Sequence, residues 1–203
     1  MLTLLKHLII EFISNNAFSN KDYFAKNNLP DFQPDFVINK IMTRKYGICM
    51  ELNYTFHDIL QQNGFDSRLI KCHKLNPKTN NFYDIYHLAI IVEISNAKYF
   101  VDVGFGEHFV EPILLLDSRK TGNICVKNVI GCHDNYSMYD LTIDSMLILR
   151  IIDLTIDIQD INENYRKFFS SRPSDFPLCR ILFERIYNPL TGTFDVVKPT
   201  CKL

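Results

Sequence analysis

The chain has 203 residues, 47% of them hydrophobic and 22% charged, which is the balance of a folded globular protein and excludes bulk disorder. Its 22 Lys and Arg against 23 Asp and Glu lack the basic excess of a dedicated nucleic-acid binder. No apolar run approaches the roughly 18 residues that a membrane-spanning helix needs, so we expect no membrane partner.

The six cysteines indicate a reducing setting. They are scattered, form no C-x-x-C pair and stand in a chain too long to need a disulfide framework. The first twelve residues, MLTLLKHLIIEF, are interrupted by charge and read as a helix and not as a signal peptide. We therefore expect a cytoplasmic protein. Cys72-His73 and Cys125…Cys132-His133 lack the spacing of a paired metal knuckle, and we expect no metal.

Helices are predicted in the first third of the chain. Apolar residues recur with helical spacing over residues 4–12, and a second short helix is predicted over 35–43. A third runs from Cys49 to about Gln62, where Gly64 is well placed to end it.

Strands are predicted to follow. Residues 67–73, 87–94 and 99–103 read as β-strands, with Ser95-Asn96 as a two-residue turn. Residues 112–116 begin a further β-rich region, and 146–158 are apolar as in a sheet. Residues 181–187 and 193–197 are predicted to form a terminal hairpin. The fold class is thus α+β, with a helical part before a mainly antiparallel β part.

Cys49 is predicted to lie where a loop becomes a helix, within the segment G-I-C-M-E-L-N of residues 47–53. The unpaired N–H groups and positive dipole end of a first helical turn favour a thiolate, and they can receive an oxyanion that forms on an attacked carbonyl. Gly47 allows close approach of the backbone just before the cysteine. The alternative is an ordinary core cysteine.

The predicted hairpin brings a histidine and a carboxylate together. With a two-residue turn at 95–96, the numbers of paired residues sum to 191, so His87 pairs with Gly104. Asp102, two residues from Gly104, then shares a face with His87 as its diagonal neighbour, within reach of a hydrogen bond. A Cys49–His87–Asp102 set follows, in which His87 takes the thiol proton and Asp102 orients the ring. The alternative is a structural histidine beside a carboxylate at the end of the hairpin.

These segments resemble the arylamine N-acetyltransferase family. Its motif near R-G-G-x-C-x-E-x-N corresponds to residues 45–53, which read K-Y-G-I-C-M-E-L-N. Its H-L-x-x-x-V strand corresponds to residues 87–92, and its V-D-V-G-F-G strand end to residues 101–106. Lys45 and Tyr46 depart from the family, and the bulky ring of Tyr46 is expected to narrow the approach to Cys49 or alter acceptor choice.

The resemblance implies a fold and a reaction. The fold is an N-terminal helical bundle, an antiparallel β-barrel-like domain and a shortened C-terminal α/β part around a cysteine-protease-like catalytic core, here residues 1–65, 66–160 and 161–203. The reaction is a ping-pong transfer from acetyl-CoA, as co-substrate, through S-acetyl-Cys49 to an arylamine, hydrazine or arylhydroxylamine, without a metal. Matched positions suggest coenzyme contacts at Tyr83, Asp84, Phe168 and Ser174.

Two other functions remain open at this point. The same three side chains serve a cysteine hydrolase or a transglutaminase-like enzyme. A non-catalytic paralogue of the same fold is the third possibility, which an inert Cys49 thiol would support. The oligomeric state and the natural acceptor are not specified by the sequence.

Overall fold

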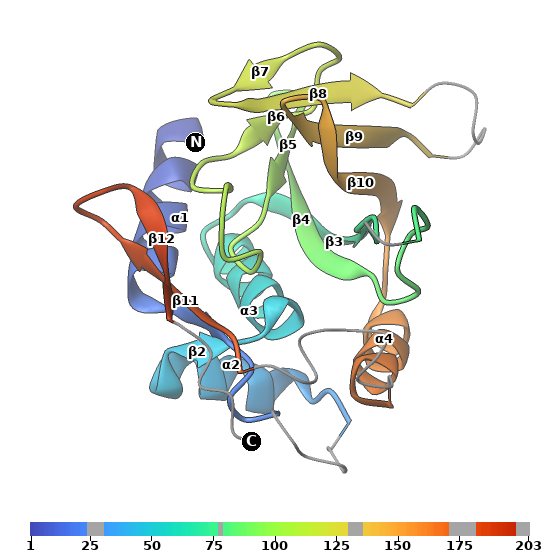
Figure 1. The fold of residues 1–203 in the computed structure, drawn as a ribbon. Helices are drawn as coiled ribbons and strands as arrows, with labels where there is room; N and C mark the ends of the chain where they lie inside the picture. The colour runs from blue at the N-terminus through green and yellow to red at the C-terminus, as the bar shows by residue number, and fades with distance from the viewer. Residues whose placement is uncertain (24–30, 77–78, 130–135, 171–181, 198–203) are drawn as a thin grey trace.

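The computed structural model describes residues 1–23, 31–76, 79–129, 136–170 and 182–197 (Figure 1). The helices are α1 (Leu2–Asn15), α2 (Pro34–Arg44), α3 (Cys49–Gln62) and α4 (Ile158–Ser170). The first three confirm the predicted helices. None of the described helices is long and apolar enough to cross a membrane.

The larger sheet is antiparallel throughout, in the order β6-β5-β4-β3-β10-β9-β8-β7. It is a nearly closed, barrel-like sheet, which confirms the predicted α+β class. Its strands are β3 (Asp66–His73), β4 (His87–Ile94), β5 (Ala97–Val101), β6 (Ile113–Leu114), β7 (Lys120–Thr121), β8 (Ile124–Asn128), β9 (Met138–Ile143) and β10 (Met146–Thr155).

A smaller sheet joins the two ends of the described chain. Its order is β12-β11-β1-β2, from β1 (Ala17–Ser19), β2 (Tyr46–Gly47), β11 (Glu184–Asn188) and β12 (Thr193–Val197). The hairpin β11–β12 confirms the predicted terminal hairpin. Strands β1 and β2 were not predicted, because each is too short for a periodic signal and is held by a partner distant in sequence.

The β4–β5 hairpin adopts the predicted turn and register. Ser95 and Asn96 have φ values of 51° and 65°, as a two-residue turn that matches the strand twist requires. Ile90 pairs with Val101 and Ile94 with Ala97, so the paired numbers sum to 191 as predicted. Strand β5 ends at Val101, and the following residues 102–104 contact the start of α3 through Asn53 and Cys49.

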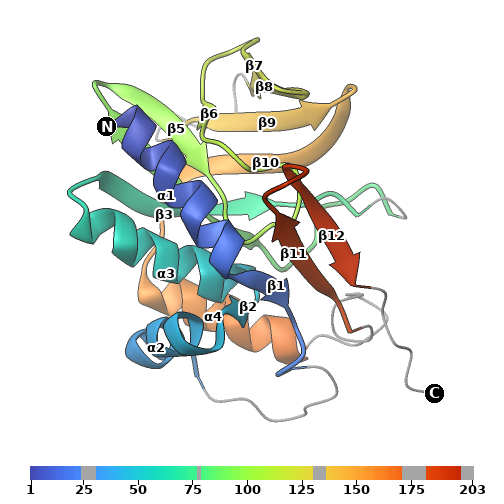
Figure 2. The ribbon, with the colours of Figure 1, turned by 90° about the vertical axis from the view of Figure 1, so that its left-hand side faces the viewer.

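The main core lies between the helices and one face of the large sheet. It contains Leu5 of α1, Phe56 of α3, Leu88 of β4 and Tyr165 of α4, all buried. In Figures 1 and 2 the helices gather on one side of the large sheet, with the β11–β12 hairpin next to α1. This core receives side chains from all three predicted parts, residues 1–65, 66–160 and 161–203. The division of the chain into three domains therefore stays a prediction.

The expectation of a strand over residues 146–158 is wrong at its end. Strand β10 stops at Thr155, and α4 begins at Ile158. Asp157 accepts the N–H groups of residues 159 and 160 through Oδ1 at 2.8 and 2.9 Å, which caps the helix. The apolar run continues through this boundary, so hydrophobicity alone does not reveal the change from strand to helix.

Candidate active site

Cys49 is the first residue of α3 and is partly exposed. Ile48 precedes it in an extended conformation, and its N–H donates to Glu51 Oε2 at 3.0 Å. Glu51, three residues after Ile48, thereby accepts a backbone N–H next to the cysteine and fixes where the helix begins. The thiol consequently stands at the positive end of the α3 dipole, as expected from the sequence.

His87 and Asp102 form the expected pair. His87 Nε2 lies 2.6 Å from Asp102 Oδ2, with 11% of the His87 side chain and none of the Asp102 side chain exposed. Asp102 Oδ1 accepts the Gly104 N–H at 2.9 Å, so both carboxylate oxygens are engaged. Because Nε2 faces Asp102, Nδ1 is the ring nitrogen left for Cys49.

The electrostatics favour a protonated His87 ring. Burial by itself lowers the pKa of His87, but the charges of Asp102 and of a Cys49 thiolate, together with hydrogen bonds to both side chains, raise it to about 10. An imidazolium at neutral pH stabilises a thiolate beside it. The structure thus places His87, with its raised pKa, next to the Cys49 side chain.

The side chain of Asn53 joins α3 to the end of the β4–β5 hairpin through hydrogen bonds. The fully buried amide donates from Nδ2 to Leu88 O and to Asp102 Oδ1, both at 2.8 Å, and accepts the Val103 N–H at 2.9 Å. Asn53 is one helical turn after Cys49, so it fixes the position of the carboxylate relative to the thiol. It belongs to the G-x-C-x-E-x-N segment, although no role was predicted for it.

Gly104 lets the hairpin end lie directly on the start of α3. A Cβ at this position would be 2.8 Å from Cys49 Cα and 2.9 Å from Cys49 O. These are backbone atoms, which a side chain cannot push aside cheaply. Gly104 therefore determines how closely the His87–Asp102 pair approaches Cys49.

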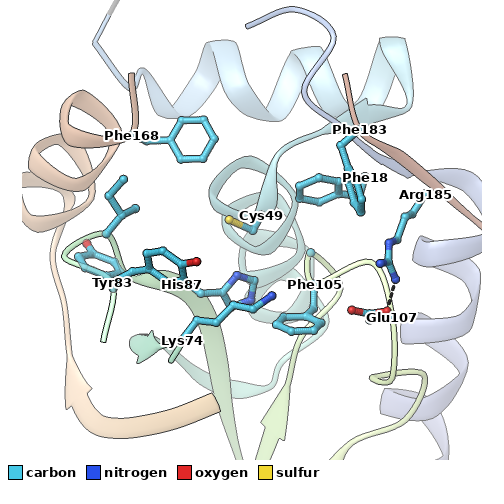
Figure 3. Close-up of a pocket in the computed structure, with 13 residues that line it drawn as sticks. Phe18, Cys49, Lys74, Tyr83, His87, Phe105, Glu107, Phe168, Phe183 and Arg185 are labelled. Atoms are coloured by element: carbon cyan, nitrogen blue, oxygen red, sulfur yellow. Dashed lines mark hydrogen bonds and ion pairs between the residues drawn. The ribbon is translucent and has the colours of Figure 1, made fainter. Parts of the chain in front are cut away.

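A cavity of about 370 Å³ opens onto Cys49 and His87 (Figure 3). This is within the range of small-molecule sites. Its aromatic lining comes from Phe18, Tyr83, Tyr86, Phe105, Phe168 and Phe183. Three charged side chains also line it, Lys74, Glu107 and Arg185.

The residues suggested for coenzyme contacts divide into three groups. Tyr83 and the buried Phe168 line the cavity (Figure 3). Asp84 is exposed and is not among the lining residues. Ser174 lies outside the described residues.

Tyr46 does not narrow the approach to Cys49, contrary to expectation. It is not part of the cavity lining. Its hydroxyl donates to Asp22 Oδ1 at 2.9 Å, and Lys21 Nζ lies 3.6 Å from its ring centroid. Contacts with Asp22 and Lys21 thus hold the Tyr46 ring outside the cavity.

A buried ionic network supports the start of α3. Lys40 Nζ of α2 donates to Glu51 Oε1 and Oε2 at 2.9 and 2.8 Å, with 3% and 0% of the two side chains exposed. The Tyr23 hydroxyl donates to Glu51, and the Tyr165 hydroxyl of α4 donates to that of Tyr23 at 2.9 Å. Burial and the adjacent Glu51 charge raise the pKa of Tyr23, which keeps this phenol a donor. The network joins α2, α4 and the segment after β1 to the first turn of α3.

Lys74, Glu107, Arg185 and Lys40 were not predicted as part of the site. Each reaches it from a separate segment, and no local motif marks them. Within the described part of the chain, no group of three His, Cys, Asp or Glu side chains is arranged to hold a metal ion.

Comparisons with known proteins show the family of the chain. The model of the N-acetyltransferase family matches residues 1–127. An uncharacterized acetyltransferase of Acanthamoeba polyphaga mimivirus is 47% identical over 200 residues, which cover 98% of this chain and 94% of the viral protein.

Solved structures of low sequence identity share the fold. Arylamine N-acetyltransferase C from Bacillus anthracis superposes with a TM-score of 0.79 at 17% identity, over 97% of this chain and 79% of that one. The Mycobacterium marinum arylamine N-acetyltransferase in complex with CoA gives a TM-score of 0.75 at 17% identity, over 98% and 81%.

The family match and the fold define an enzyme of the acetyltransferase class. The chain belongs to the arylamine N-acetyltransferase family.

Proposed function

We propose that the enzyme transfers an acetyl group from acetyl-CoA, through S-acetyl-Cys49, to a small arylamine, hydrazine or arylhydroxylamine. The observation that carries this proposal is the 2.6 Å contact of His87 with buried Asp102, on a hairpin end that lies against the first turn of the helix bearing Cys49. Family membership supports the acetyl transfer, and the CoA complex of the M. marinum protein supports the donor.

In the first half-reaction the Cys49 thiolate attacks the carbonyl carbon of the thioester. The carbon–sulfur bond to coenzyme A then breaks, and the departing thiolate takes a proton from the His87 imidazolium. N–H groups of the first turn of α3 stabilise the oxyanion that forms on the way. The products are S-acetyl-Cys49 and free coenzyme A.

In the second half-reaction the acceptor nitrogen attacks the acetyl carbon. His87 takes a proton from that nitrogen, and Cys49 leaves as the thiolate. Asp102 orients the ring throughout and stabilises the imidazolium. We assign Tyr83 and Phe168 to contacts with the acyl-bearing arm of the coenzyme, because both line the cavity that opens onto Cys49.

Intact-mass measurement after mixing with acetyl-CoA tests the donor and the nucleophile together. We expect one added acetyl group, absent in Cys49→Ser, which keeps the fold. Cys125→Ser is the matched control, because Cys125 is likewise a partly buried free cysteine but lies in β8. An acetyl group that persists in Cys49→Ser refutes the assignment. Peptide cleavage, with no acetylation of Cys49 by acetyl-CoA, would favour the hydrolase.

A further inference from the structure

Asn164 joins α4 to the residue that precedes His87. Its side chain is buried, and its amide makes two hydrogen bonds with the backbone of Tyr86: Oδ1 accepts the N–H at 3.0 Å, and Nδ2 donates to the carbonyl oxygen at 2.8 Å. The same Nδ2 also donates to the sulfur of Met50 at 3.3 Å. Because Met50 follows Cys49 in the chain, one amide contacts a neighbour of each of the two side chains that must meet.

Strand β4 begins before its pairing with β5 does. The ladder with β3 includes His87, whereas the ladder with β5 starts three residues later. Tyr86 and Leu88, on either side of His87, are alternate residues, so their backbone N–H and C=O groups face the same edge of the strand. At this edge Leu88 O accepts Nδ2 of Asn53, and Tyr86 is bonded to Asn164. Two asparagines from α3 and α4 thus hold the backbone before and after His87.

Helix α4 is anchored by contacts that do not involve Asn164. The Tyr165 hydroxyl donates to that of Tyr23 at 2.9 Å, and Asn162 Oδ1 accepts the Phe32 N–H at 2.8 Å. The apolar face of the helix is buried in the main core. The amide of Asn164 therefore has a fixed position from which it holds the start of β4, and its loss alone is expected to leave the fold in place.

The position of the His87 backbone determines where the ring meets Cys49. His87 Nε2 is engaged by Asp102 at 2.6 Å, so a displacement of the strand moves Nδ1 relative to the thiol. A misplacement approaching 1 Å at a reacting group lowers rates by up to about a hundredfold. A primary amide is suited to hold Tyr86, because it donates and accepts at the same time, as a strand backbone does. An aliphatic side chain of similar size leaves both backbone groups of Tyr86 without this partner.

We propose that Asn164 is a positioning residue, which holds the start of β4 so that the His87 ring meets the Cys49 thiol. The inference rests on the proposed function, since it requires Cys49 and His87 to act as a pair. Asn164 does not line the cavity, so it acts through the backbone of Tyr86 and not on a substrate. Its replacement by an uncharged residue leaves the charged partners of His87, Asp102 and Cys49, unchanged.

The test is the pH dependence of Cys49 alkylation by iodoacetamide, followed by peptide mass in the wild type, Asn164→Leu and Asn164→Ala. We expect the midpoint of the rate profile to rise by about one pH unit in both variants, which makes the reaction about tenfold slower below the midpoint. Above about pH 10 the rates should agree within about twofold, since the thiol then ionises without help. Asn164→Ala is the second variant, because the space that it leaves admits water to the Tyr86 backbone and spares the fold.

Two controls separate positioning from a loss of stability. Asn162→Leu removes a hydrogen bond from the same helix, but one that leads to Phe32 and not to Tyr86. It should lower Tm and leave the alkylation profile unchanged. In the His87→Gln background, Asn164→Ala should change the alkylation rate less than about twofold, because no imidazole remains to be positioned.

Three results would overturn the inference: an unmoved midpoint in the Asn164 variants, an equal shift in Asn162→Leu, or a full tenfold loss in the His87→Gln background. Intact mass after mixing with acetyl-CoA keeps the inference separate from the proposed function. Alkylation needs no acyl donor, so a midpoint that depends on Asn164 supports positioning even if acetyl-CoA does not acetylate Cys49. Normal acetylation with an unmoved midpoint overturns positioning and leaves the proposed function intact.

Discussion

Gly104→Ala tests whether the spacing between the hairpin end and α3 controls the reactivity of Cys49. The added Cβ would lie 2.8 Å from Cys49 Cα, 2.9 Å from Cys49 O and 2.7 Å from Asn53 Nδ2. Neither the α3 backbone nor the Asn53 amide, which holds three hydrogen bonds, is free to move. The segment 102–104 must therefore shift away from Cys49.

The size of the shift follows from these contacts. Ordinary van der Waals contact begins at 3.4 Å, so the contact at 2.8 Å requires a displacement of about 0.6 Å. Overpacking of this kind costs roughly 1–3 kcal/mol, or about 2–4 °C in Tm per kcal/mol for a chain of this size. A misplacement approaching 1 Å at a reacting group lowers rates by up to about a hundredfold, and we expect a loss of ten- to a hundredfold.

The assays are the rate of Cys49 alkylation by iodoacetamide at pH 7, the rate of acetylation by intact mass, and thermal unfolding by circular dichroism. Gly122→Ala is the matched control, because Gly122 has open space around it and a φ of 57°. Its added Cβ causes backbone strain, which lowers Tm without changing Cys49 reactivity. Wild-type alkylation and acetylation rates in Gly104→Ala would refute the claim that this contact positions the His87–Asp102 pair.

Two further predictions concern the charges around Cys49. The pKa of His87 is raised from 6.5 to about 10, so the folded protein binds this proton more tightly than the unfolded chain. The resulting stability is complete below about pH 6.5 and is lost as the pH rises toward 10. The Tm advantage of the wild type over His87→Gln should therefore shrink across this window, and a constant difference would contradict the ion pair. Lys40→Met should cost about 3–5 kcal/mol in urea unfolding by leaving Glu51 buried without its counter-ion, and adding Glu51→Gln should recover part of it. Strictly additive losses would show that the two residues are not coupled.

Local sequence patterns were sufficient to predict the elements that carry Cys49, His87 and Asp102. The start of α3 at Cys49 and the two-residue turn at Ser95-Asn96 depend on residues adjacent in the chain. A fixed turn length then determines which side chains of a hairpin share a face, so the pairing of His87 with Asp102 could be deduced without coordinates. The β4–β5 ladder ends at Ile90 and Val101, so the predicted pairing of His87 with Gly104 is not part of it, although His87 still meets Asp102.

The cavity could not be predicted in the same way. Phe18, Lys74 and Arg185 come from β1, the segment after β3 and β11, and only the small sheet and the shared core bring them together. Neither a periodic pattern nor a motif records which distant segments meet. Apart from Tyr83 and Phe168, which the family resemblance suggested, the aromatic and cationic residues of the chain gave no signal that distinguishes cavity residues from surface residues.

Lys45 and Tyr46, the two departures from the family motif, do not line the cavity. Lys45, where the family has an arginine, is exposed with a φ of 62° and ends α2, while the cation that meets Glu51 comes from Lys40, one turn earlier in the same helix. Tyr46 fills the space on the side of β2 and engages Asp22, which also lies 3.4 Å from Lys40 Nζ. Tyr46 thus belongs, through Asp22 and Lys40, to the network that holds Glu51 and the first turn of α3, whereas the exposed Lys45 lies outside it. A Tyr46→Gly variant should accordingly affect stability more than acceptor choice, because the ring contacts this network and not the cavity. Urea unfolding measures the effect on stability, and the ratio of kcat/KM for two acceptors of different size measures the effect on acceptor choice. A changed ratio of kcat/KM at an unchanged free energy of unfolding would contradict this account.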